Sequence, residues 1–223
     1  MNFSKAIWWK VLTALLLLYT VVGGLLLDVP RLAILNETIR NQYFHVPMWF
    51  SMVIILTISL VYAIKYLIDP SVKNDLISSR FAFTGVVMGM LGIFTGMIWA
   101  KFTWGDWWVN DPKLNSAAIC LLIYLAYIVL RSSFEDDLQR SRVSAVYNIF
   151  AYSAMIPLLF ILPRLTDSLH PGNGGNPGFN IYDLDNKLRM IFYPAVIGWT
   201  FIGVWLSTLR VRISLIEDKL TNG

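Results

Sequence analysis

The sequence has 223 residues, of which 57% are hydrophobic and only 14% are charged, and its net charge is +4 at pH 7. Soluble domains carry about 25% charged residues, so this chain has too few to cover a water-facing surface. The basic excess forms no stripe and accompanies no RNA-binding signature, which argues against a nucleic-acid partner. The composition therefore indicates an integral membrane protein.

Six apolar segments follow one another along the chain, and several reach the roughly 20 residues that a helix needs to cross a membrane. They cover residues 7–27, 47–68, 81–100, 116–131, 143–162 and 190–209. The first lacks a small-residue cleavage site and is too long for a signal peptide, so we expect a retained helix. We predict an all-α integral membrane protein, a single membrane domain over residues 1–223 formed by a bundle of six transmembrane helices.

The third apolar segment carries glycines that recur on one helical face. They are Gly85, Gly89, Gly92 and Gly96. Small residues at this spacing usually allow two membrane helices to pack closely, which is the structure we expect. The alternative is a groove in which a flat ligand approaches the backbone.

The connections between the segments alternate in character. Loops 69–80 and 132–142 are short and polar, whereas loops 28–46, 101–115 and 163–189 contain both histidines and most of a tryptophan cluster. If the N-terminus is inside, 11 of the 18 basic residues are cytoplasmic, as the positive-inside rule favours. The eleven are Lys5, Lys10, Lys65, Lys73, Arg80, Arg131, Arg140, Arg142, Arg210, Arg212 and Lys219. We therefore predict that both termini are inside and that the three longer loops share the outer face.

The tryptophan cluster lies in residues 99–116, WAKFTWGDWWVNDPKLNS, which hold four of the nine tryptophans. Four of its residues have the spacing i, i+3, i+4, i+7 that places side chains on one helical face: Trp104, Trp107, Trp108 and Asp111. Pro112 is compatible with a short interfacial helix that ends at the residue before it. Tryptophan belts are common at membrane interfaces. Three indoles in register with one carboxylate would instead suit a flat, broad, partly apolar ligand.

The only two histidines, His45 in NQYFHVPMWF and His170 in TDSLHPGNGG, lie on the same predicted side as these tryptophans. A single histidine in a loop is usually just a polar residue. Neutral imidazole is also a common ligand of iron, and two imidazoles can occupy both axial positions of a haem. Nearby basic residues would then meet the haem propionates or serve as interfacial anchors: Arg40, Lys101, Lys113, Lys187 and Arg189.

Other classes of protein remain open from the residues alone. A b-type membrane oxidoreductase normally places histidine pairs on facing helices inside the bilayer, and neither histidine lies inside a predicted span. A transporter for haem or a small molecule is expected to carry charges within its spans, and here only Lys65 comes close. A purely structural subunit is a further possibility. The single Cys120 excludes an internal disulfide.

The segment WGDWWVND resembles the WWD signature of the haem-handling proteins of cytochrome c maturation, roughly Trp-Gly-x-Trp-Trp-x-Trp-Asp followed by a basic residue and Leu. The matching residues are Trp104, Gly105, Trp107, Trp108, Asp111, Lys113 and Leu114. YFHVP around His45 and SLHPG around His170 are similar to the segments with this family's two external histidines. Asn110 replaces the third tryptophan of the signature, and Lys113 stands where arginine is common, which replaces a bidentate clamp with a point charge.

The length and the six segments resemble those of the small branch of this family, cytochrome c maturation protein C (CcmC). The resemblance implies that the WWD loop lies between helices three and four and that haem b is held non-covalently at the outer face of the bacterial inner membrane. It implies that His45 and His170 are the axial ligands of the haem iron. The implied haem-binding residues are His45, His170, Trp104, Gly105, Trp107, Trp108, Asp111 and Lys113.

The resemblance also implies partners. Haem would pass to the periplasmic haem chaperone (CcmE), with the ABC-type transporter subunits (CcmA, CcmB), a small subunit (CcmD) and membrane lipid as neighbours. Larger relatives, the haem–apocytochrome synthases, have additional membrane-embedded histidines, and this chain has none to spare. We therefore expect a haem-delivery protein rather than an enzyme, with the covalent attachment chemistry on the chaperone.

Overall fold

The computed structural model of the chain describes residues 6–30, 35–170 and 184–222. Within these ranges the chain forms helices and no strands, and six helices are long and apolar enough to cross a membrane. The predicted all-α membrane fold is confirmed. The six are α1 (Trp8–Leu26), α2 (Gln42–Ile68), α3 (Val72–Trp104), α4 (Pro112–Ser132), α5 (Asp137–Ile156) and α7 (Asn186–Asn222).

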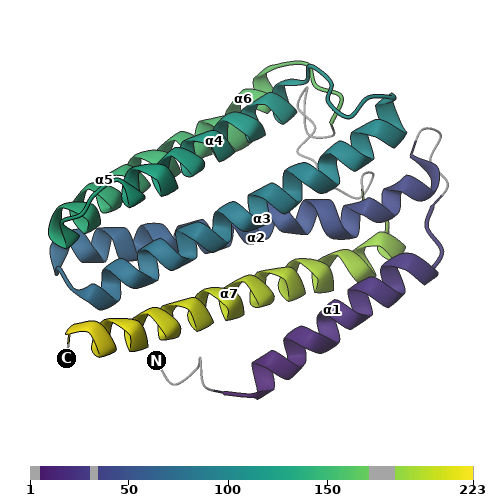
Figure 1. Ribbon diagram of the computed structural model, residues 1–223. Coiled ribbons are helices and arrows are strands. Elements are labelled where there is room, and N and C mark those ends of the chain that lie inside the picture. Colours follow the sequence, from purple (N-terminus) through teal and green to yellow (C-terminus); the bar gives the residue numbers. More distant parts are fainter. Residues whose placement is uncertain (1–5, 31–34, 171–183, 223) are drawn as a thin grey trace.

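Short elements extend two of these helices. A 3₁₀ helix, η2 (Asn36–Asn41), leads directly into α2, and a π-helical turn, η3 (Pro157–Ile161), followed by α6 (Leu162–Leu165), continues α5. Figure 1 shows the long helices as three antiparallel pairs, α1 with α7, α2 with α3, and α4 with α5. The α2–α3 pair lies in the middle, and both of its helices also contact α7 and α5.

Most helices are longer than the apolar segments that predicted them. α2 begins at Gln42 rather than at residue 47, and α3 begins at Val72 rather than at residue 81. Polar side chains stabilise the added turns: the Ser71 hydroxyl accepts a hydrogen bond from the Asn74 N–H at 3.3 Å, in the manner of a helix N-cap. Hydropathy therefore underestimates the lengths of these helices, because their polar end turns are stabilised by capping hydrogen bonds and not by burial of apolar side chains in lipid.

The glycine face of α3 packs directly against α2, which confirms the expected close packing. A Cβ atom added to each glycine would lie within 2.9 Å of an α2 side chain. The pairs are Gly85 with Leu56, Gly89 with Met52, Gly92 with Trp49, and Gly96 with His45. This contact fixes the position of His45 along α3.

The two ends of the bundle differ in what they contain. Figure 1 shows the start of α1 and the end of α7 at one end. The other end, called the site end here, contains the beginning of α2, the α3–α4 connection and the segment that follows α6. The tryptophan stretch and both histidines belong to the site end, so the structure brings together three parts of the chain that are far apart in sequence.

Candidate functional site

Within the tryptophan stretch, residues 105–111 are not helical and separate α3 from α4, so the predicted one-faced interfacial helix is wrong. α3 ends at Trp104, and Gly105 follows with φ +91°, the left-handed conformation that commonly ends helices at glycine. The connection then runs to Asp111, which has extended backbone and is the N-cap of α4. Pro112 starts that helix instead of following the end of one, because proline suits the first helical position.

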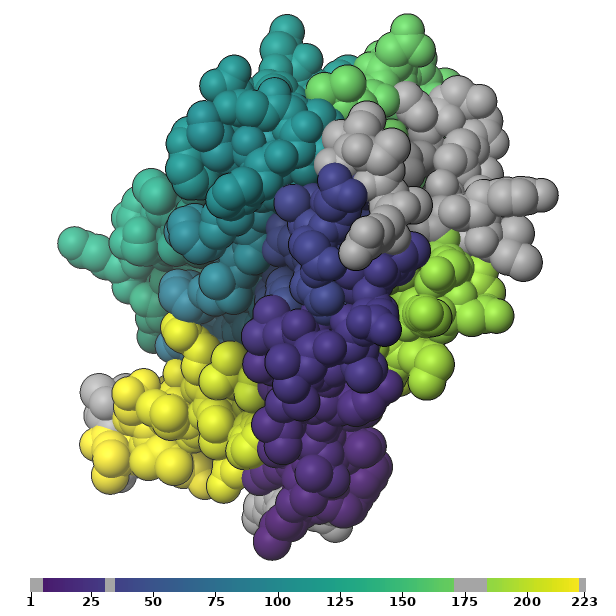
Figure 2. Space-filling view, turned by 90° about the vertical axis from the view of Figure 1, so that its right-hand side faces the viewer, coloured from purple at the N-terminus to yellow at the C-terminus, as the bar shows by residue number. Residues whose placement is uncertain are grey.

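Asp111 is the centre of the hydrogen bonds that hold the site end together. Its side chain is buried, with the residue 2% exposed. The carboxylate accepts from the Lys113 N–H at 2.9 Å and the Leu169 N–H at 2.8 Å. It also accepts from the Ser168 hydroxyl at 2.9 Å and lies 3.1 Å from Nδ1 of His170. One carboxylate therefore ties the start of α4 to the segment after α6, and Figure 2, which faces this end, shows both regions at its upper edge.

Burial determines the protonation state of His170, and its contact with Asp111 determines which ring nitrogen carries the proton. Burial opposes ionisation of Asp111, but the hydrogen bonds from Leu169 and Ser168, with His170 nearby, hold its pKa below the usual value. Burial lowers the pKa of His170 to about 4, although the charge of Asp111 acts in the opposite direction. The imidazole is therefore neutral at pH 7. Because a carboxylate only accepts, Nδ1 carries the proton and Nε2 keeps its lone pair.

His45 is held in the same way by a different helix. It lies near the start of α2, not in a loop, and its Nδ1 is 2.9 Å from the Gly92 carbonyl oxygen and 3.3 Å from the Thr95 hydroxyl. A carbonyl oxygen only accepts, so Nδ1 donates and Nε2 is again the unprotonated nitrogen. Among the residues that the structure describes, neither Nε2 has a hydrogen-bond partner.

Indole rings stand beside both imidazoles. Trp104 lies edge-on to His170, with ring centroids 4.9 Å apart. Trp99 and Trp49 lie edge-on to His45 at 5.8 and 6.3 Å. Trp49 is not among the site residues predicted from the sequence, because its contact with His45 depends on the register of α2 against α3. A signal was present, since Trp49 follows His45 by one helical turn.

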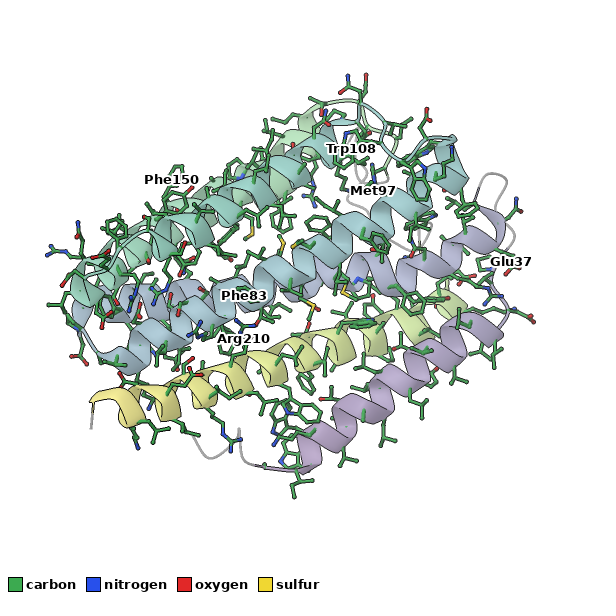
Figure 3. The ribbon with its side chains drawn as sticks, in the orientation of Figure 1. Glu37, Phe83, Met97, Trp108, Phe150 and Arg210 are labelled. Atoms are coloured by element: carbon green, nitrogen blue, oxygen red, sulfur yellow. The ribbon has the colours of Figure 1, made fainter. Side chains whose placement is uncertain are left out.

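Trp107 and Trp108 of the predicted stripe are separate from these contacts and largely exposed, at 52% and 40%. Figure 3 shows Trp108 at the outer edge of the site end. Its Nε1–H donates to Asn115 at 3.3 Å, and the Asn115 amide donates to Asn110 at 2.8 Å. Asn110, where the WWD signature has a tryptophan, thus belongs to the hydrogen bonds that orient Trp108.

The basic residues near the site have different roles. Arg40 is fully engaged, because its guanidinium donates to the Gly24 and Leu27 carbonyls at 3.0 and 2.6 Å and pairs with Glu37. Lys101 donates to the Gly105 carbonyl at 2.7 Å. Lys113 is the cation that lies within electrostatic reach of both histidines.

Arg164 also lies within electrostatic reach of Lys113. It lies in α6, whereas the sequence predicted it to lie in the loop 163–189. Lys113 places positive charge near the imidazoles and Arg164 adds to the charge around Lys113, whereas Asp111, the buried acid here, already accepts several hydrogen bonds.

The side chains gathered at the site end suit one kind of ligand. The chain has two histidines in all, and among the described residues no three His, Cys, Asp or Glu side chains are grouped so that they could hold a metal ion. A metal held by both imidazoles would then take its other ligands from a non-protein group. Histidines that ligate metals usually donate their second ring N–H to a carboxylate or carbonyl, as both do here. Indoles and excess positive charge fit a flat, anionic ring. Fold and site together define a multi-pass membrane protein whose paired imidazoles suit an anionic metal macrocycle.

Comparison with known proteins agrees with this class. The family model described as heme exporter protein C matches residues 1–222, and the chain belongs to this family. It is 33% identical over 221 residues to heme exporter protein C of Rhodobacter capsulatus, covering 96% of this chain and 87% of that one.

Two further relatives with the same name are similar over much of their length. The Paracoccus denitrificans protein is 33% identical over 187 residues, covering 83% of this chain and 76% of that one. The Haemophilus influenzae protein is 27% identical over 194 residues, covering 82% of this chain and 74% of that one. The resemblance found in the sequence is confirmed, and membership implies haem handling for cytochrome c biogenesis by a multi-pass membrane protein.

Proposed function

We propose that this protein binds haem b non-covalently at the outer face of the bacterial inner membrane and delivers it to the haem chaperone CcmE. The observation that carries the proposal is that both histidines are held through the same ring nitrogen, Nδ1. Each is held through Nδ1, by Gly92 or by Asp111, and among the described residues each Nε2, at the same end of the bundle, has no hydrogen-bond partner. Haem bound there is cargo whose iron takes two axial nitrogen ligands.

The surrounding residues have distinct roles in this proposal. His45 and His170 supply the axial nitrogens, and Asp111 positions His170. Gly105 turns the chain out of α3 so that Trp107 and Trp108 can cover the ring with exposed indole surface. Lys113 meets a propionate as a single point charge, as its ammonium dictates.

Delivery is supported by where the site lies. Trp107 and Trp108 are exposed in a connection between two apolar helices, so a bound ring would be accessible from the aqueous phase. A soluble domain can therefore approach it. We include CcmA, CcmB and CcmD as partners in the membrane, and we assign the covalent chemistry to the chaperone rather than to this protein.

The proposal is tested by haem transfer between purified components. The haem-loaded protein, mixed with haem-free chaperone, should lose haem from its absorbance spectrum as the chaperone gains covalently bound haem in equal amount. Chaperone that acquires haem equally fast from free haem, without this protein, would contradict delivery.

The orientation gives a separate prediction. A reporter that is active only outside the cytoplasm should work when fused after Asp167, in the exposed segment that follows α6, and fail after Asp136, between α4 and α5. The basis is the 11 of 18 basic residues placed inside. Position Asn173, the natural choice in the same loop, lies outside the described residues. Activity in the reverse pattern would place the site in the cytoplasm and rule out periplasmic delivery.

The packing of His45 gives another prediction. In Gly96→Ala the new Cβ would lie 2.7 Å from Cε1 of His45, and a ring cannot bend away as a flexible chain can. We expect the imidazole to shift and the absorbance of bound haem to change toward a weaker axial ligand. Gly89→Ala is the matched control, because its Cβ would meet the flexible Met52 side chain. Identical spectra for both variants would show that the α2–α3 contact does not position the ligand.

A further inference from the structure

Three arginines from three helices meet at the end of the bundle opposite the histidines. Arg131 of α4 and Arg210 of α7 each lie within electrostatic reach of Arg80 of α3. Each stands where an apolar segment of its helix begins or ends: residues 81–100, 116–131 and 190–209. Side chains at such positions lie at the level of lipid headgroups in a membrane protein.

The three guanidinium groups are not equally neutralised. Arg131 forms a bidentate pair with Asp75, with nitrogen–oxygen distances of 2.8 and 2.6 Å. Arg80 donates through Nε to the neutral Ser214 hydroxyl at 2.9 Å. Asp75 is therefore committed to Arg131 and cannot also form a close pair with Arg80.

Arg210 is the least satisfied of the three. Its guanidinium lies 3.8 Å from the centroid of the Phe83 ring, and Figure 3 shows the two side chains together between α3 and α7. Its Nε is buried and has no hydrogen-bond partner. Among the residues that the structure describes, Arg210 forms no ion pair. A charged donor without a partner is costly. Arg210 as a whole is only half-buried, so the terminal nitrogens of its guanidinium can take an acceptor from outside the chain.

The local charge favours an anion. Two acids, Asp75 and Glu217, lie within electrostatic reach of Arg80. The cluster itself contains three positive charges, on Arg80, Arg131 and Arg210, so positive charge is in excess. Guanidinium groups match phosphate oxygens geometrically, and basic pockets between membrane helices commonly bind anionic headgroups. A phosphate group at headgroup level would supply the missing acceptors.

We propose that Arg80 and Arg210 form a binding site for an anionic phosphate group, from a phospholipid headgroup or from free phosphate. The site is separate from the histidines and independent of the proposed haem function. Bound there, the group links α3, which carries Arg80, to α7, which carries Arg210.

The test is titration of the detergent-purified full-length protein, measured by native mass spectrometry. Phosphatidylglycerol should bind to the wild type and to Arg212→Gln, and about tenfold more weakly to Arg210→Gln, as the loss of one charge-assisted hydrogen bond predicts. Arg212 is the matched control, because it carries the same charge on the same helix and is exposed. Phosphatidylcholine should bind weakly to all three.

Inorganic phosphate distinguishes the two sources. Competition by millimolar phosphate supports the site and includes free phosphate as a ligand, whereas absence of competition assigns the site to lipid. Arg80→Gln provides a second variant, and unchanged helical circular dichroism together with an unchanged elution volume in size-exclusion chromatography shows that each variant is folded. Equal phosphatidylglycerol binding by the wild type and both arginine-site variants, or equal loss in Arg212→Gln, would overturn the proposal.

Discussion

Asp111→Ala should reduce the haem retained per mole of protein by at least about tenfold, or 1.4 kcal/mol. The substitution removes the N-cap of α4, which is worth about 1 kcal/mol. It also removes the acceptor for the Ser168 hydroxyl and the Leu169 N–H, and a buried donor left unpaired costs about 1–3 kcal/mol. His170 would lose the partner that fixes its orientation. Haem is measured by pyridine haemochrome on protein purified at matched expression.

Asp106→Ala is the matched control for this variant. Asp106 is acidic and lies in the same α3–α4 connection, but it is exposed. Its loss should leave haem content nearly unchanged. The haem content of Asp111→Asn should lie between those of Asp106→Ala and Asp111→Ala, because the amide keeps one acceptor oxygen and the size of the side chain. Equal loss of haem from the Asp106 and Asp111 alanine variants would show that the Asp111 hydrogen bonds do not organise the site.

His45→Ala and His170→Ala should each convert six-coordinate, low-spin haem to a five-coordinate or water-ligated form. Loss of one axial ligand need not remove the ring, because Trp107 and Trp108 offer apolar surface of their own. We expect the double variant to lose most of its haem. Absorbance spectra of the oxidised and reduced proteins report the coordination state directly.

Added imidazole provides a control for the histidine variants. It should restore the low-spin spectrum of His45→Ala, because the ring leaves a space between α2 and Gly96 of α3 that the same ring can refill. An unchanged spectrum in both single variants would show that these histidines are not the ligands.

The helices were largely predictable from the sequence, and their ends were not. Runs of apolar residues identify six spans, because lipid requires them at nearly every position. The early start of α2 depends instead on contacts with α3. Asn41 donates to the Thr95 carbonyl at 2.8 Å and His45 bonds to Gly92, so polar residues that hydropathy excludes are satisfied by a neighbouring helix. Pro47, where the predicted segment begins, lies inside α2.

The candidate site was predictable in composition but not in shape. Helical spacing grouped Trp104 with Asp111, although the intervening Gly105 and the Asp-Pro pair are themselves signals for a helix end and a new helix start. The helix-ending glycine and the Asp-Pro pair outweigh the helical spacing of the side chains in this connection. The contact of Asp111 with Ser168 and His170 joins segments more than 50 residues apart, and no local pattern encodes it.

The most direct measurement for the central claim is the absorbance spectrum of the detergent-purified protein from cells with sufficient haem. Two histidine ligands to one haem predict a low-spin spectrum, with a sharp Soret band and split visible bands on reduction. Protein that is folded but carries no haem under these conditions, or haem that stays high-spin in the wild type, would contradict the account.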